Sequence, residues 1–199
     1  ITNINISGIH VLWYILLNIE DNLDITKYIC TILESKGQNI KKIVDTPNII
    51  KNYLLNDLTD IDSINIFKYL VETYKVNMTV QNSSNKYSPI FNAIYEKSNK
   101  IFDYIRNHST NINDPNFLKI KSSTGSTLLH VAVYTNNIYA IDKLYEMSNR
   151  LKVNIAIIKN HNTKLPHEIT DNITDNKLGK YYAYEKYIDY QISIERDLE

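Results

Sequence analysis

The stretch that decides the fold is "TGSTLLHVAVYTNNIYAIDKLYEM", residues 124–147. Its first part, "GSTLLHVA" from Gly125 to Ala132, places a histidine in a short apolar segment that follows a glycine and two hydroxyl residues. Its second part forms one apolar stripe on a helix, made of Ile138, Ile141, Leu144 and Tyr145. The stretch predicts two helices joined by a short loop, and the role of His130 decides between an enzyme and a binding surface.

Two other segments resemble "TLLHVAVY" from Thr127: "SGIHVLWY" from Ser7 and "SPIFNAIY" from Ser88. Their fourth positions pair His10, Phe91 and His130, at steps of 81 and 39 residues. A second marker, a β-branched residue in a polar turn, recurs at steps of 36, 36 and 41 residues, at Ile40, Val76, Ile112 and Val153. We therefore predict an internal repeat whose paired helices bury their apolar faces only by stacking on neighbours.

Two weaker segments complete the pattern. The repeat between the first two clear motifs has a good second helix, and "TPNIIKNYLLND" is the candidate for its first helix. In the last repeat, "KLPHEIT" aligns Pro166 with Pro89 and leaves His167 outside the histidine position. The final "KYYAYEKYIDYQISIERDLE" predicts a helix that caps the array, with the alternative that its tyrosines form an interface and with partial exposure at Tyr181 and Tyr182.

This pattern resembles the ankyrin repeat, whose signature is G-x-T-P-L-H-x-A followed by a second helix, a glycine and a Val-Asn turn. The divergent, elongated repeats are similar to those of viruses and intracellular bacteria, whose AT-rich genomes also favour the Asn, Ile, Lys and Tyr seen here. The resemblance implies an all-α solenoid of stacked helix-loop-helix repeats with short extended turns. It implies one domain, 1–199, with about four to five repeats at 1–42, 43–80, 81–116, 117–158 and 159–199.

The resemblance also implies a protein–protein interaction scaffold that binds through its turn tips and concave helix face. The predicted partner-binding residues are Tyr14, Ser84, Asn85, Tyr87, Tyr95, Glu96, Ser123, Thr124, Ser126, Tyr134 and Thr135. Three of them follow the small residue of each motif and are expected on one face: Tyr14, Tyr95 and Tyr134. The alternative is that these tyrosines pack between repeats.

Composition limits the other classes of function. The 22 basic and 22 acidic residues give no global charge for nucleic acid or an anionic membrane. The longest apolar run, "IHVLWYILL", is far shorter than the roughly 20 residues that span a bilayer. The single cysteine excludes an internal disulfide and fits a reducing compartment. We expect a cytoplasmic monomer, in a host cytoplasm if it is an effector, without metal or cofactor.

Candidate catalytic residues have structural interpretations. Phe91 shares the position of His130, which favours a structural histidine bonded to the Thr127 hydroxyl or nearby backbone over a general base. Cys30 is expected to be a buried, inert thiol rather than a partner of His10. His161 and His167 are expected in a solvent-facing loop, and the carboxylates of Asp60 and Asp62 at a helix N-terminus.

Two further hypotheses stay open. The chain begins at Ile1 without a methionine, so we expect a fragment or a processed product. It is then a candidate for the substrate-recruiting module of a larger enzyme or effector whose catalytic part lies elsewhere. A hydrolase or transferase site within these 199 residues is the remaining alternative. The sequence does not identify the partner protein.

Overall fold

The computed structural model describes residues 10–48, 50–109, 113–169 and 177–197. Within these ranges the chain forms helices and no strand, which confirms the all-α prediction. The chain divides into two compact units, Ile1–Asn107 and His108–Glu199, called unit 1 and unit 2 below. The single domain expected for residues 1–199 stays a prediction.

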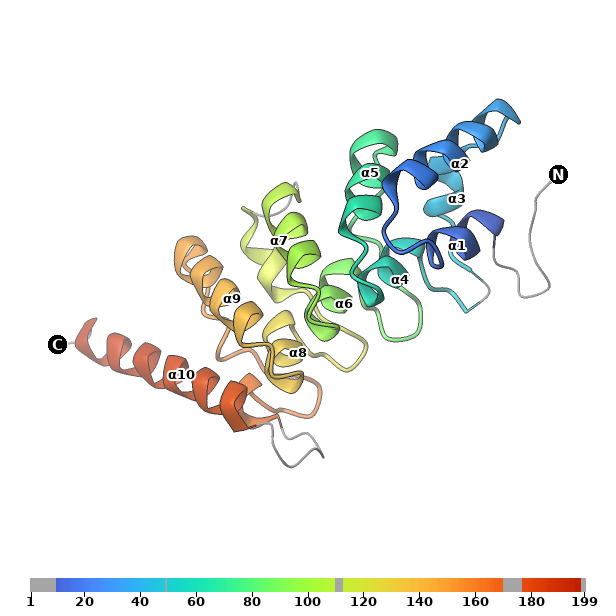
Figure 1. Cartoon of the computed structure of the whole chain (residues 1–199). Helices are drawn as coiled ribbons and strands as arrows, with labels where there is room; N and C mark the ends of the chain where they lie inside the picture. The colour runs from blue at the N-terminus through green and yellow to red at the C-terminus, as the bar shows by residue number, and fades with distance from the viewer. Residues whose placement is uncertain (1–9, 49, 110–112, 170–176, 198–199) are drawn as a thin grey trace. The chain divides into compact units, whose positions relative to one another are not determined.

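In its described residues, unit 1 contains three helix pairs in which a short helix precedes a longer one, and one further helix of five residues between the first two pairs. Its helices are α1 (Val11–Leu16), α2 (Leu23–Ser35), α3 (Ile40–Val44), α4 (Leu54–Asp60), α5 (Ile64–Tyr74), α6 (Pro89–Tyr95) and α7 (Asn99–His108). The short helices α4 and α6 pack together, and the longer helices α2 and α5 do the same (Figure 1). The unit's core contains four aromatic side chains that are almost fully buried: Trp13, Phe67, Phe91 and Phe102.

Unit 2 repeats this arrangement with different lengths. Its elements are the 3-10 helix η1 (Pro115–Lys119), α8 (Leu128–Tyr134), α9 (Ile138–Leu151), the 3-10 helix η2 (Pro166–Glu168) and α10 (Lys177–Asp197). Helix α10 packs against α8, α9 and η2 (Figure 1). Gly179 and Ala183 lie on its packed face, where a Cβ on Gly179 would come within 2.9 Å of the Asn136 Oδ1. Small residues one turn apart therefore allow the close approach of α10.

The loop inside each helix pair has a recurring backbone geometry. A residue with positive φ stands two positions before the second helix at Asp21, Asp62, Lys97 and Asn136, with φ of 51°, 50°, 60° and 53°. In three of these loops the next N–H donates to the carbonyl five residues earlier: Ser63 to Leu58 at 3.0 Å, Ser98 to Ala93 at 2.9 Å and Asn137 to Ala132 at 2.9 Å. This bond satisfies a carbonyl at the end of the short helix and turns the chain into the long one.

Two of these loop residues also cap the second helix of the following pair. The Asp21 carboxylate accepts hydrogen bonds from the N–H groups of Asn65 (3.1 Å) and Ile66 (2.9 Å) at the start of α5. The Asn136 Oδ1 accepts from the Gly179 N–H at 2.8 Å, in the first turn of α10. The same loop position thus links successive pairs in both units.

Each connection from one pair to the next contains a short turn directly before the next short helix, and we call these turns the tips. Each tip closes through a backbone hydrogen bond: Asn48 to Asn52, Asn82 to Tyr87, Ser122 to Ser126 and Asn160 to Lys164, at 2.9–3.0 Å. Consecutive tips are also joined, because the Ser83 N–H donates to the Lys51 carbonyl (3.4 Å) and the His161 N–H to the Thr124 carbonyl (3.1 Å). These bonds stack neighbouring tips within each unit.

The register of the short helices corrects one sequence alignment. His10 is the N-cap of α1, and its Nδ1 accepts from the Leu12 N–H at 3.1 Å. The third helical position, held by Phe91 in α6 and His130 in α8, belongs to Trp13 in α1. The alignment of His10 with Phe91 and His130 was therefore wrong by three residues, since "IHV" and "LHV" look alike in sequence whereas the helices begin at different points.

The two weaker segments lie where they were predicted. Helix α4 begins at Leu54, inside "TPNIIKNYLLND", and its third position is Asn56. Pro166 is the first residue of η2, as Pro89 is of α6, and the third position of η2 is Glu168. A proline at the first helical position loses no hydrogen bond, which explains why it recurs there.

Candidate functional site

His130 is fixed by hydrogen bonds on both ring nitrogens. Its Nδ1 accepts from the Thr127 N–H (3.2 Å) and lies 2.8 Å from the Thr127 Oγ1, while its Nε2 donates to the Lys164 carbonyl at 3.0 Å. The predicted bond to Thr127 is confirmed. The ring is 1% exposed, and burial lowers the pKa of the imidazole. His130 therefore ties the start of α8 to the tip 160–164.

At the third position of other short helices, the side chain makes one of the two kinds of contact that His130 makes. The Asn56 Nδ2 donates to the Tyr87 carbonyl at 3.2 Å, so it also reaches the next tip. The Glu168 carboxylate accepts from the Leu165 N–H at 2.7 Å, so it also holds its own N-cap. The position thus has a structural task in several pairs, which supports a structural role for His130.

The predicted tip residues of unit 1 form an ordered turn. The Asn82 Oδ1 accepts from the Asn85 N–H (3.1 Å) and from the Ser84 hydroxyl (3.3 Å), and the Asn85 Oδ1 accepts from the Tyr87 N–H at 2.8 Å. Ser84 is exposed, whereas Asn85 and Tyr87 are half-buried. This tip presents its outer side chains on a backbone that is already fixed by hydrogen bonds.

Tyr87 and Tyr95 belong to one aromatic column along α6. The Tyr87 ring stacks on Phe91 with centroids 5.1 Å apart, and it meets the Tyr95 ring edge-on at 6.2 Å. Tyr95 is 43% exposed, and Glu96 beside it is also exposed. The structure therefore brings together Tyr87, Tyr95 and Glu96, which were predicted from two separate parts of the motif.

Tyr14 differs from the other two predicted tyrosines. It is 63% exposed, but it holds the fourth position of α1, whereas Tyr95 and Tyr134 are the last residues of seven-residue helices. The difference follows from the shifted register of His10. Tyr14 thus corresponds to Asp57 of α4 and Asn92 of α6, one turn before the position of Tyr95.

Sequence reasoning missed an acidic group beside this face. Burial, together with the neighbouring Asp60 carboxylate, raises the pKa of Asp57 to about 7. Burial and the Glu96 carboxylate raise the pKa of Asp60 to about 6. The interpretation of Asp60 as helix N-terminal charge was wrong, because it is the last residue of α4. The repeat period could have corrected this interpretation, because it aligns Asp60 with Tyr95, the last residue of α6.

In unit 2 the tip is a cluster of hydroxyl groups. The Thr124 Oγ1 lies 2.9 Å from the Ser122 Oγ and 3.0 Å from the Ser126 Oγ, and the Ser122 Oγ accepts from the Ser126 N–H at 3.2 Å. Ser123 and Thr124 are exposed, and Ser126 is half-buried. The side chains of this tip therefore hydrogen-bond to one another and to its backbone.

The helix end of unit 2 matches that of unit 1. Tyr134 is 43% exposed at the end of α8, the same fraction as Tyr95. Thr135 follows it and donates its hydroxyl to the Val131 carbonyl at 3.0 Å, so this side chain closes the helix. Tyr95 and Tyr134 belong to different units, and a common face that includes both stays a prediction.

The remaining candidate residues have structural surroundings. Cys30 is fully buried, as predicted, and burial raises the pKa of its thiol to about 11. His161 is exposed, but His167 is half-buried with its ring 4.7 Å from that of Tyr187, so its prediction as a solvent-facing residue was wrong. Among the residues described, no group of three or more histidine, cysteine or acidic side chains is arranged to hold a metal.

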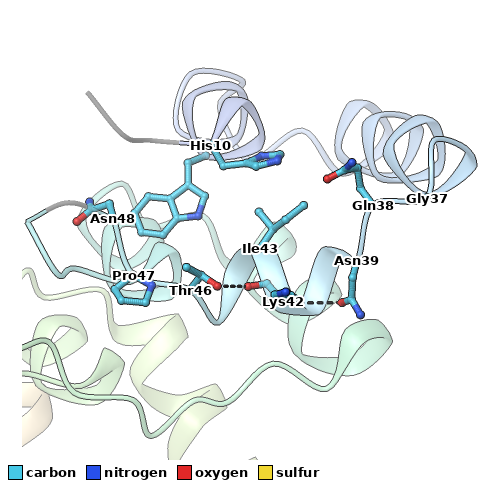
Figure 2. Close-up of a pocket in the computed structure, with 10 residues that line it drawn as sticks. His10, Gly37, Gln38, Asn39, Lys42, Ile43, Thr46, Pro47 and Asn48 are labelled. Carbon is cyan, nitrogen blue, oxygen red and sulfur yellow. Dashed lines mark hydrogen bonds between the residues drawn. The ribbon is translucent and has the colours of Figure 1, made fainter. Parts of the chain in front are cut away.

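A groove in unit 1 lies between α1 and α3 and has a volume of about 380 Å³ (Figure 2). Trp13, Ile43 and Pro47 supply its apolar wall. The Lys42 N–H donates to the Asn39 Oδ1 at 2.9 Å, and the Thr46 hydroxyl donates to the Lys42 carbonyl at 2.5 Å. These groups serve the α3 backbone, and His10, which also lines the groove, accepts from the Leu12 N–H through its Nδ1.

Two tyrosines near the start of α10 were predicted to be partly exposed. Tyr181 is 61% exposed and Tyr182 is half-buried, with its hydroxyl bonded to the Asp142 carboxylate, as the expected partial exposure requires. The structure does not describe the side chains of Ile194 and Leu198, which lie in the last part of the predicted capping segment. No helix in the described ranges is long and apolar enough to cross a membrane.

Known proteins resemble this chain in fold and not in sequence. No family of known proteins and no curated protein matches it. Among solved structures, it resembles one chain of the structure described as the Bd0816 predatory endopeptidase from Bdellovibrio bacteriovorus in complex with immunity protein Bd3460. The TM-score is 0.64 and the identity 15%, over 94% of this chain and 81% of that chain. At this identity the likeness shows a shared helical fold and nothing about activity.

Proposed function

We propose that this chain is a protein-binding module built from divergent ankyrin-like repeats, which recognises a partner protein through its tips and the exposed ends of its short helices. The helix pairs, the recurring loop geometry and the stacked tips support ankyrin-type repeats. The short-helix ends expose Tyr95 and Tyr134 at the same helical position in two units. A host-directed effector in the cytoplasm is the setting we propose for it.

The observation that carries this proposal is the recurrence of a half-exposed tyrosine on a fixed support. Tyr95 rests on the aromatic column of Tyr87 and Phe91, while Tyr134 ends a helix that His130 fixes to the neighbouring tip. Tyrosine gives a large contact area at a small cost in side-chain entropy, and it is enriched among residues that dominate binding energies. A supported tyrosine at a repeated position is suited to partner recognition.

The chemistry of the candidate catalytic residues also favours binding. Both nitrogens of His130 are engaged in structural hydrogen bonds, and the Cys30 thiol is buried with a raised pKa. A nucleophile needs an accessible thiolate or hydroxyl next to a free base. Neither residue has these surroundings, so we propose a module without catalysis of its own.

Affinity capture with matched variants tests the proposal. The full chain, a Tyr95→Ala/Tyr134→Ala variant and a Tyr28→Ala control are used as baits in extracts of candidate host cells. Tyr28 is 68% exposed on the long helix α2, outside the proposed surface. We expect the double variant to lose partners that the control retains, with circular dichroism of all three unchanged. Unchanged capture of every partner by the double variant would contradict the proposal.

A further inference from the structure

We propose that unit 2 carries a second binding site, a basic pocket that takes an acidic segment of a partner protein with an aliphatic residue among its carboxylates. The pocket has a volume of about 530 Å³ and is lined by Lys119, Lys121, Lys152, Val153, Asn154 and Ile157 together with one neighbouring isoleucine. None of these residues belongs to the surface proposed above. The site goes beyond the proposed function because it adds a ligand of defined chemistry.

Two turns of the chain bring the lysines together. Lys119 ends η1 and Lys121 follows it, while Lys152 ends α9 in the left-handed conformation with φ of 53°. Helix α9 packs against η1, so these two turns are neighbours. The Lys121 Nζ donates to the Lys159 carbonyl at 2.9 Å, which holds this ammonium group at the wall formed by the following turn.

The positive charge of this pocket is not balanced locally. Between residues 114 and 168 the chain has seven lysine and arginine residues and four acidic residues. One of those acids, Glu146, pairs with Lys143 at 2.7 Å rather than with the pocket. In the described part of unit 2, no carboxylate lies within 4.0 Å of the ammonium groups of Lys119, Lys121 or Lys152. An anionic ligand would therefore meet three cations that have no ion pair to break.

The pocket lining also contains apolar side chains and one amide N–H donor that has no acceptor among the described residues. Ile157 is 47% exposed, and Val153 lines the pocket beside it. The Asn154 Oδ1 accepts from the Ala156 N–H at 2.9 Å, but its Nδ2 is buried without an acceptor among the described residues. The unpaired N–H dipole adds to the positive potential below the lysines. The lining therefore suits carboxylates and an aliphatic side chain together.

A protein ligand fits this lining better than a nucleic acid. Sites for single-stranded nucleic acid combine cations with aromatic side chains or arginines on which bases stack. The pocket lining contains neither an aromatic residue nor an arginine. The chain as a whole also has 22 basic and 22 acidic residues, so it has no global attraction for a polyanion. Isoleucine and valine between lysines match an aliphatic residue within an acidic peptide.

Fluorescence anisotropy with defined probes tests this site on the full chain. The probes are labelled peptides in which Asp and Glu flank one Leu, Ile or Phe, a peptide with Lys in place of the acids, and a 20-nucleotide single-stranded DNA. A Lys119→Gln/Lys121→Gln/Lys152→Gln variant removes the pocket charge. A Lys27→Gln/Lys36→Gln/Lys100→Gln variant removes the same charge from exposed positions of unit 1 and is the matched control.

We expect an acidic peptide to bind, the pocket variant to weaken it about tenfold, and the control to stay within about twofold. Ile157→Ser is expected to weaken binding of the Leu peptide by about threefold. Equal losses in the two lysine variants, or no binding of any acidic peptide, would overturn the proposal. DNA binding that only the pocket variant loses would replace the protein ligand with a nucleic acid. A Tyr95→Ala/Tyr134→Ala variant should bind these peptides normally, so the two surfaces fail or succeed separately.

Discussion

The starts of α6 and α8 have the same backbone and different chemistry. In unit 2, Thr127 and His130 form a polar pair, and His130 continues to the Lys164 carbonyl. In unit 1, Ser88 and Phe91 hold the equivalent positions, and Phe91 stacks on Tyr87 instead. The Ser88 hydroxyl is then buried without a hydrogen-bond partner among the described residues. At this helix start, the packing of Phe91 on Tyr87 takes the place of the hydrogen bonds that His130 makes, but the Ser88 hydroxyl is left unsatisfied.

The tips that precede these helices differ in the residue that adopts a positive φ. Gly125 stands two residues before Thr127 with φ of 74°, and Lys86 stands two residues before Ser88 with φ of 57°. A Cβ on Gly125 would lie 2.7 Å from the backbone nitrogen of His161 and 2.4 Å from its ring. The tip of unit 2 therefore requires glycine both for its backbone angles and for contact with the next tip.

The largest expected effect is that of Gly125→Ala, which removes this feature of unit 2. We expect the free energy of unfolding to fall by about 2–3 kcal/mol, because the new Cβ meets backbone and the φ is strained. Urea unfolding followed by circular dichroism measures it. The matched change Lys86→Gly in unit 1 should leave stability unchanged or raise it by about 0.5 kcal/mol. A loss for Lys86→Gly as large as for Gly125→Ala would break the contrast between the tips.

The next effect is expected when His130 of unit 2 is replaced by phenylalanine, the residue at the equivalent position of unit 1. His130→Phe removes the hydrogen bonds to Thr127 and Lys164 and leaves both partners buried, so we expect a loss of about 2 kcal/mol. Hydrogen exchange should show faster opening at the Thr127 region and at the tip 160–164, while unit 1 is unchanged. A His130→Phe variant as stable as the original chain would show that the polar pair contributes nothing.

A smaller pair of effects separates the two hydroxyl groups. Thr127→Ala should cost about 1 kcal/mol, because it removes the partner of the His130 Nδ1. Ser88→Ala should be neutral or stabilise the chain by about 0.5 kcal/mol, because it removes a buried hydroxyl that has no partner. Thermal unfolding of the two variants in parallel measures the difference. Equal losses would mean that Ser88 has a partner in solution.

The last contrast is in the response of stability to pH, which has opposite signs in the two units. The pKa of Asp57, about 7, is raised above its unfolded value, so its contribution is present in acid and is lost as pH rises through 7. The pKa of His130 is lowered by burial, so its contribution is present above the unfolded value and is lost as pH falls. Lowering the pH from 8 to 5 should therefore favour unit 1 near Asp57 and disfavour unit 2 near His130.

The variant Asp57→Asn/Asp60→Asn checks the acidic side of this contrast. It should raise the unfolding temperature at pH 8 by about 2–4 °C and should reduce the gain on acidification, because the buried carboxylates no longer ionise. His130→Phe should instead reduce the loss seen in acid. A double asparagine variant with the original pH dependence would exclude these carboxylates as its cause.

Local patterns in the sequence predicted much of this molecule. Helical periodicity identified the long helices, and the hydroxyl before the first helix predicted the Thr127–His130 bond. The predicted alignment of His10 with Phe91 and His130 was wrong, because a three-residue motif does not show at which residue a helix begins. Asp57 and Asp60 were missed, since burial raises both pKa values and the pKa of Asp60 also depends on Glu96 in the next helix pair. No local pattern encodes that proximity.

The sequence by itself determined that the chain is helical, that short and long helices alternate, and that His130 belongs to a repeated construction. These properties depend on side-chain periodicity and on capping within a few residues. Only the tertiary structure decided that Gly125 faces His161, that Asp21 caps α5, and that three lysines line one pocket. Those features join residues about 30–45 positions apart, and the distance between such residues is set by how neighbouring helix pairs stack.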